Sequence, residues 1–184
     1  MAIVSRVSAG VDLASRFQYV NDEVFYAPER IVSVDRADVE ALKAQALKNP
    51  RRRARLCAHH SVDDTLHEML IAHAKDIYVR PHKHINKSES FHIIEGELSV
   101  MLFNEEGGIV SVIEMSPQNC FFYRLSESAF HTVVPTSDMV VFHETTNGPF
   151  NRSDTMFAPW SPEENDVQGQ KTYMETLRAM RNEV

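Results

Sequence analysis

Short runs of alternating apolar and polar residues, separated by polar turns, occupy most of the middle of this chain. Successive side chains of a strand point to opposite faces, so the alternation predicts strands with one buried face. The predicted strands cover residues 17–26, 51–60, 66–74, 91–94, 99–103, 109–115, 130–134 and 139–144. Many short strands joined by tight turns favour an all-β core, an antiparallel double-sheet jelly roll.

Helical spacing occurs on either side of this β-rich region. Asp35 is a suitable N-cap for a helix with one apolar stripe, and this helix should end at Asn49, before Pro50. A second stripe runs over residues 172–180, and Gly169 argues against an earlier start. We expect both helices to flank the β core as packing elements.

Length and apolar content indicate a single domain. A chain of 184 residues, of which 43% are apolar, can bury one substantial core. We expect an N-terminal strand and helix extension over residues 1–60, a β-barrel over 61–160 and a C-terminal helical tail over 161–184.

Charge and cysteine content narrow the range of partners and compartments. The formal net charge of −7 argues against a broad nucleic-acid surface. No apolar run approaches the length of a membrane span, and residues 1–10 do not resemble a secretion signal. Two cysteines, Cys57 and Cys120, imply no disulfide framework. We therefore expect a soluble cytoplasmic protein without nucleic-acid or membrane partners.

The segment from Tyr78 to Gly96 contains the candidate chemistry. His82 and His84 share one face of an extended strand, so their imidazoles converge. After a polar turn, Glu89 opens the next strand and can return its carboxylate to the same place. Two histidines and a carboxylate on one side of a divalent ion form a recurrent catalytic metal site. Mixed ligation of this kind suits Zn, Fe, Ni or Mn.

The spacing His-x-His, four residues, Glu, six residues, Gly is similar to the first signature motif of the cupin superfamily. It is matched at His82, His84, Glu89 and Gly96. A closer resemblance is to the WbuC-type cupin-fold metalloproteins, which occur among bacterial surface-polysaccharide genes. The segments that carry this closer resemblance are 49–59, 66–72, 78–96 and 142–150.

This resemblance implies a double-stranded β-helix, the cupin jelly-roll barrel, with one divalent transition metal ion inside. Cupins commonly complete the metal site with one more histidine from a second motif, and His131 is the candidate by its order along the chain. Cys120, Ser126 and Ser128 depart from that motif, which has Gly, Pro and Gly there. A homodimer is expected by analogy with the fold.

A basic strand precedes the metal segment. Read as a strand, residues 51–60 place Arg53, Arg55 and His59 on one face. One interpretation is a solvated basic strand. The other is a substrate-binding surface whose guanidinium groups hold a phosphate or carboxylate. Arg80, on the same face as His82 and His84, is a further candidate for substrate binding.

Two residues are candidate proton-transfer groups. His143 follows Met139 and Val141 in phase and reaches the pocket if that apolar pair faces the barrel interior. Tyr78 is the second candidate. For His67 and His73 the simpler expectation is an ordinary packed histidine, and His92 is expected on the opposite face of its strand.

Three functions agree with these features. The first is a metal-dependent enzyme acting on a small anionic or sugar-derived substrate in surface-polysaccharide metabolism. The second is an Fe(II)-dependent dioxygenase, and the third is a non-catalytic module that binds a metal or a small ligand. Residue spacing alone does not separate them.

Overall fold

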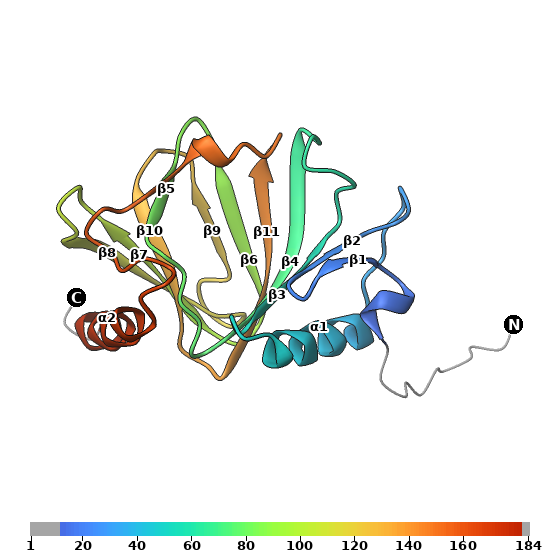
Figure 1. The fold of residues 1–184 in the computed structure, drawn as a ribbon, viewed down its shortest axis with the longest axis horizontal. Helices are drawn as coiled ribbons and strands as arrows, with labels where there is room; N and C mark the ends of the chain where they lie inside the picture. The colour runs from blue at the N-terminus through green and yellow to red at the C-terminus, as the bar shows by residue number, and fades with distance from the viewer. Residues whose placement is uncertain (1–11, 182–184) are drawn as a thin grey trace, which may run out of the picture.

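The computed structural model describes residues 12–181, which form two facing β-sheets and two flanking helices (Figure 1). Residues 1–10, tested above for a secretion signal, lie outside this range. The strands are β1 Gln18–Asn21, β2 Val24–Tyr26, β3 Arg53–Cys57, β4 Leu66–Ala74, β5 His82–His84, β6 Glu89–Glu95, β7 Leu98–Phe103, β8 Ile109–Met115, β9 Phe122–Leu125, β10 Phe130–Pro135, β11 Met139–Asn147 and β12 Thr155–Phe157. Short 3-10 turns occur at Leu13–Ser15 and Arg152–Asp154.

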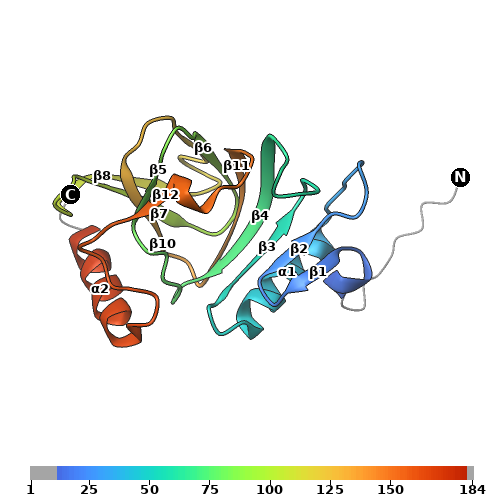
Figure 2. The same cartoon turned by 45° about the horizontal axis from the view of Figure 1, so that its top comes forward.

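The strand order defines a jelly-roll barrel. The larger sheet has the order β1-β2-β3-β4-β11-β6-β9, and the smaller has the order β12-β5-β10-β7-β8. The paired strands are antiparallel except for β2 and β3, which are parallel. The predicted fold class, an all-β core with flanking helices, is confirmed. The N-terminal strands β1 to β3 lengthen the larger sheet at one edge (Figure 2).

Helix α1, Arg36–Lys48, covers the outer face of the larger sheet. Asp35 caps it as predicted, in a capping box with Asp38. Its buried residues pack in one cluster with outward-facing residues of β3, β4 and β11. That cluster contains Val39, Leu42, Ala46, Ala54, Leu56, Ala72 and Val141. Both faces of the larger sheet are therefore apolar, because one lines the barrel and the other receives α1.

Helix α2 spans Val167–Met180 and begins five residues before the predicted start. Gly169 does not delay the helix. The side chain of Asp166, the N-cap, accepts a hydrogen bond from the Gly169 amide, so the glycine lies in the first turn. Met174 and Leu177 are buried against residues of the smaller sheet. The two helices thus flank opposite sides of the barrel (Figures 1 and 2).

Gly96 lies in the turn between β6 and β7, as predicted. Its φ of +74° is in the left-handed region, and a Cβ atom there would overlap the carbonyl of Met139. Only glycine allows the chain to pass this close to the start of β11.

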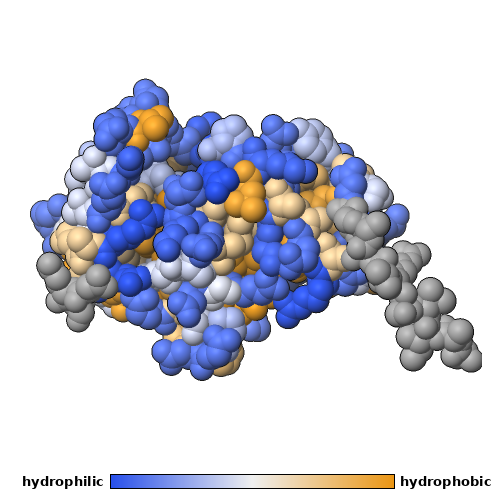
Figure 3. Space-filling view, turned by 90° about the horizontal axis from the view of Figure 1, so that it is seen from below, coloured by the Kyte–Doolittle hydropathy of each residue, from blue (hydrophilic) through white to orange (hydrophobic). Residues whose placement is uncertain are grey.

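Neither helix length nor helix hydropathy indicates a membrane span in the described part of the chain. No helix within residues 12–181 is long and apolar enough to cross a membrane. Seen from below, the surface is largely polar with separate apolar spots (Figure 3).

Candidate metal centre and ligand cavity

Three imidazoles converge inside the barrel from two paired strands of the smaller sheet. His82 and His84 lie on β5, and His131 on β10 is the direct register partner of His82. Ligand nitrogens of the three side chains all lie within 4.8 Å of one another. Alternation along β5 and pairing with β10 are thus sufficient to bring the three rings together.

The backbone fixes the tautomers of two of these rings. Nδ1 of His82 lies 2.8 Å from the carbonyl oxygen of Arg80, and Nδ1 of His131 lies 3.0 Å from that of Ala129. A carbonyl oxygen can only accept, so each Nδ1 donates and the Nε2 lone pair is left free. Metal-binding histidines are commonly held in this way.

A carboxylate from the opposite sheet completes the group. Glu89, at the start of β6, is buried, with Oε1 2.6 Å from His131 Nε2 and Oε2 3.6 Å from His84 Nε2. Within residues 12–181, neither Glu89 Oε1 nor His131 Nε2 makes a hydrogen bond of acceptable geometry, although both are buried. Buried acceptors that approach without pairing suit a shared cation. The residues present therefore fit a divalent metal ion.

The electrostatics of the group agree with this fit. Burial, followed by the neighbouring imidazoles, lowers the pKa of His82 to about 3, so its ring is neutral at pH 7. Burial opposes ionisation of Glu89, but contact with His131 outweighs it and the pKa of Glu89 is lowered. His82 therefore offers a neutral imidazole and Glu89 a carboxylate, the forms that bind metals, while the contact with Glu89 raises the pKa of His131 against the effect of burial.

The four side chains border a cavity of about 410 Å³ between the two sheets. This volume is within the usual range for small-molecule sites. Its inner wall on the larger sheet is mainly apolar, with Met69 and Ile71 from β4, Phe91 from β6 and Phe142 from β11. A ligand in the cavity would therefore be held largely out of water next to the candidate metal site.

Glu144 is a cavity residue that the sequence pattern did not reveal. On β11 it faces Phe91 of β6, while its neighbour Thr146 faces Glu89, so Glu144 is a diagonal neighbour of Glu89. In the described part of the chain its carboxyl has no ion pair or hydrogen bond. Burial, and then the charge of Glu89, raises its pKa to about 8.

Strand β11 does not have the phase that would bring His143 to the cavity. Val140 and Phe142 belong to the inner cluster, whereas Val141 packs with α1 on the outer face. His143 consequently points outward, with Nε2 3.9 Å from Glu68, and does not border the cavity. Both faces of β11 are apolar, so alternation alone did not identify which one is internal.

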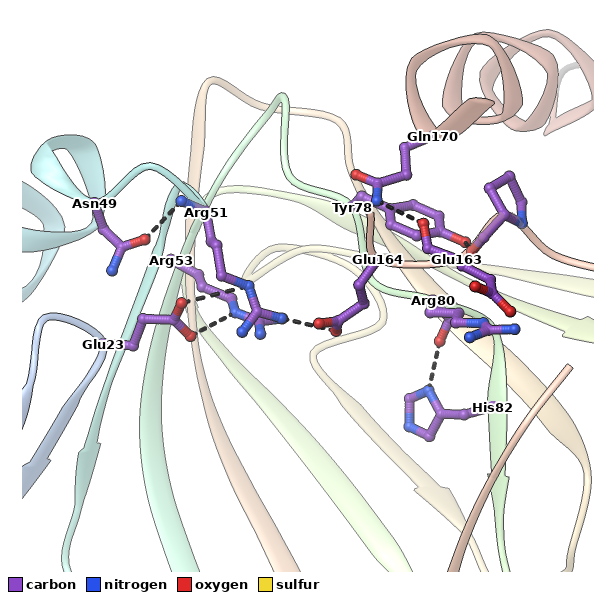
Figure 4. A network of polar contacts seen from close by, with 11 residues as sticks. Glu23, Asn49, Arg51, Arg53, Tyr78, Arg80, His82, Glu163, Glu164 and Gln170 are labelled. Carbon is purple, nitrogen blue, oxygen red and sulfur yellow. Dashed lines mark hydrogen bonds and ion pairs between the residues drawn. The ribbon is translucent and has the colours of Figure 1, made fainter. Parts of the chain in front are cut away.

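Tyr78 and Arg80 also lie away from the cavity. The Tyr78 hydroxyl donates to the carbonyl oxygen of Pro162 (Figure 4). The ring of Tyr78 packs edge-to-face against that of Tyr173. Arg80 Nε donates to Ser161 Oγ, and its guanidinium lies over the Phe157 ring. The prediction for Arg80 rested on strand alternation, which does not apply because β5 begins only at His82.

Arg53, Arg55 and His59 do border the cavity. Arg53 is paired with Glu23, which also contacts Arg51 (Figure 4). The ring of His59 stacks on His67 with centroids 4.1 Å apart. Roles for these residues in substrate binding remain predictions.

Comparisons with known proteins were made at the level of families, sequences and structures. A family model described as a domain of unknown function (DUF6016) matches residues 34–115. A search of curated proteins gave no match. Among solved structures, protein SO0799 from Shewanella oneidensis aligns with a TM-score of 0.50 and 6% identity, covering 67% of this chain and 82% of that one. Together with the two-sheet topology, this likeness decides the architecture. The chain has a cupin fold.

Two larger proteins match more weakly. The capsular polysaccharide assembling protein CapF from Staphylococcus aureus aligns with a TM-score of 0.46 and 17% identity, over 57% of this chain and 31% of CapF. Oxalate decarboxylase from Lactobacillus farciminis aligns with a TM-score of 0.41 and 14% identity, over 51% and 27%. This chain thus spans less than a third of either protein. The WbuC-type assignment remains a prediction.

Proposed function

We propose that this protein is a metal-dependent enzyme acting on a small, oxygen-rich substrate, anionic or sugar-derived, in bacterial surface-polysaccharide metabolism. The observation that carries the proposal is the convergence of His82, His84, His131 and Glu89 at the wall of a ligand-sized cavity. The polysaccharide context comes only from the resemblance to WbuC-type proteins.

The four side chains would hold one divalent ion, with Zn, Fe, Ni and Mn as the candidates. When bound, such an ion supplies Lewis acidity to a substrate oxygen. Other residues of the cavity would exclude water and transfer protons. Met69, Phe91 and Phe142 exclude water from the reacting groups, which strengthens electrostatic interactions there.

Glu144 is the proposed proton-transfer residue in place of Tyr78 and His143. Its carboxyl group faces the cavity one diagonal step from Glu89, close to where a metal-oriented substrate would lie. A protonated carboxyl group can give its proton to a substrate oxygen, become a carboxylate, and regain a proton from product or solvent. Within the part of the chain described, its carboxyl group forms no ion pair, and the nearby charge of Arg55 lowers its pKa less than burial and Glu89 raise it.

The proposal can be tested by elemental analysis of protein from its native host, followed by single-turnover assays of the metal-replete protein on nucleotide sugars and related sugar acids. Turnover that is lost on chelation and restored by the native metal would support it. Oxygen consumption with Fe(II) would indicate a dioxygenase instead. Tight ligand binding without turnover across this substrate class would indicate a binding module.

Glu144→Gln tests the proton-transfer role within the same assay. We expect turnover to fall by roughly 10²- to 10⁴-fold, the usual contribution of a general acid or base, while the metal content is unchanged. Glu68→Gln is the matched control, because Glu68 neighbours His143 on the outer face. Equal activity of the Glu144 and Glu68 variants would remove Glu144 from the mechanism.

A further inference from the structure

Arg51, Arg53 and Arg55 are spaced two residues apart along the chain. They differ in whether a carboxylate pairs with the guanidinium group. Arg53 Nε lies 2.9 Å from Glu23 Oε2, and Arg51 contacts both Glu23 and Glu164 (Figure 4). Across residues 12–181, the side chain of Arg55 has no carboxylate partner and no hydrogen bond. The uncompensated positive charge of this group is therefore that of Arg55.

That charge lies at the cavity. Arg55 borders it together with Cys57, His73 and Glu144, and the charge of Arg55 acts on the pKa of each of these three groups. An arginine with open donors next to an apolar wall favours a carboxylate or phosphate, which it binds by paired, charge-assisted hydrogen bonds.

Arg55 is also distant from the candidate metal ligands. On the larger sheet the order β3-β4-β11-β6 places Glu89 three strand steps from Arg55, roughly 14 Å across the curved sheet at the usual spacing. The row of Arg55 reaches β6 at Ile93, so Glu89 is also displaced along β6. The wall between them contains Ile71 and Phe142, which continue the row of Arg55 across β4 and β11. Arg55 and an ion at the histidines would therefore contact different parts of one ligand.

We propose that Arg55 forms an anion-binding subsite in this cavity, separate from the metal site, and that the ligand carries a carboxylate or phosphate group there. The ligand is then a small acid with a metal-binding oxygen at one end, an apolar or uncharged middle and the anionic group at the other end. This rests on the proposed function only in assigning the first end to the metal.

Arg55 rather than Arg53 is the anchor because Glu23 already occupies the donors of Arg53 that face it. An anion beside Arg53 would have to displace that carboxylate or approach it, and like charges repel. An anion beside Arg55 meets no such competitor. Glu144 borders the same cavity, but within residues 12–181 its carboxyl group forms no ion pair with Arg55.

The test is a titration of metal-stripped and metal-loaded protein with inorganic phosphate and, separately, acetate, followed by amide chemical shifts. We expect saturable shifts around β3 and β4 in both forms of the protein. Arg55→Gln should weaken binding by about tenfold or more, since a hydrogen bond to a charged group contributes about 1.5–3 kcal/mol. Comparing the two anions shows whether the subsite prefers a phosphate or a carboxylate.

Arg36→Gln is the matched control, because Arg36 pairs with Glu95 away from the cavity. It should leave anion binding unchanged, and Arg55→Lys should restore part of it. Far-UV circular dichroism checks that each variant is folded.

Unaltered binding in Arg55→Gln would overturn the proposal, as would binding that disappears with the metal. If the protein binds metal but no anion, the subsite proposal is wrong and the proposed function still stands. If the protein binds the anion but takes up no metal, the subsite proposal stands and the proposed metal-dependent function is wrong.

Discussion

The imidazoles of His82 and His131 are orientated by backbone carbonyl groups two residues earlier in the chain, at Arg80 and Ala129. This local contact fixes which nitrogen carries the proton, and pairing of β5 with β10 then aims the free nitrogens at one point. The chemistry of the site therefore depends on individual side chains with little rotational freedom.

Removing one imidazole should weaken metal binding strongly. We expect His131→Ala to lower metal affinity by at least 100-fold, because the remaining donors come from one short strand and one carboxylate. Isothermal titration with Zn²⁺ after chelation measures the change. His92→Ala, on the exposed outer face of β6, should bind as the wild type does, and equal losses in the two variants would contradict a site at His131.

His73 should make the protein acid-sensitive. Burial, and then the charges of Arg53 and Arg55, lowers its folded-state pKa from 6.5 to about 3. Protonation therefore favours the unfolded state, so the stability present above pH 6.5 is lost as the pH falls toward 3. The loss is roughly 1.4 kcal/mol per pH unit, or about 2 kcal/mol at pH 5.

Urea unfolding at pH 7.5 and pH 5 measures this loss in the wild type and in His73→Leu. The wild type should lose about 2 kcal/mol more than the variant between the two pH values. The same loss in both proteins would show that His73 does not titrate on unfolding.

At the scale of elements, each helix is defined by its cap and by the sheet face that it covers. Asp35 and Asp38 form the reciprocal cap of α1, and Asp166 caps α2 through the amide of Gly169. A glycine near a helix start can thus belong to the helix, because its amide is free to meet the cap. The predicted late start of α2 did not allow for this.

Loss of the α1 cap should destabilise the fold without affecting the cavity. Asp35→Ala removes the acceptor for the amides of Ala37 and Asp38, and we expect a loss of about 1 kcal/mol in unfolding free energy. Urea denaturation measures it. Glu40→Ala, on the same helix but outside the cap, should cost less. Metal affinity should be unchanged in both variants, since α1 lies on the outer face of the sheet.

At the scale of the whole molecule, the candidate metal site joins the two sheets. The three histidines belong to the smaller sheet and Glu89 to the larger one, so an ion bound to all four would link the barrel walls. The same ion would compensate the buried polar atoms that otherwise lack partners.

Metal binding should therefore stabilise the entire barrel. At a free ion concentration 100 times Kd, binding to the folded state alone should raise the unfolding free energy by about 2.7 kcal/mol. For a chain of this size, that corresponds to an increase of roughly 5–10 °C in Tm. Thermal unfolding of stripped protein with and without Zn²⁺ measures the shift. His131→Ala should show none, and a shift of the same size in that variant would place the ion elsewhere.

Period-two alternation, the cap at Asp35 and the spacing of His82, His84 and Glu89 were sufficient to predict the β core, the first helix and the grouping of these three side chains. Each depends on local geometry: strand alternation, a helix cap, or a short turn between adjacent strands. Short-range patterns therefore predict most of the fold class. They identify strands with one buried face, and such strands must pack against a second sheet.

The tertiary structure decided which face of β11 is internal, and hence that Glu144 rather than His143 meets the cavity. It also turned Tyr78 and Arg80 toward the segment before α2. A sequence pattern shows that a face is apolar but does not show what covers it. In this protein α1 covers the outer face of the larger sheet, and only the packing of the helix against the strands distinguishes that face from the inner one.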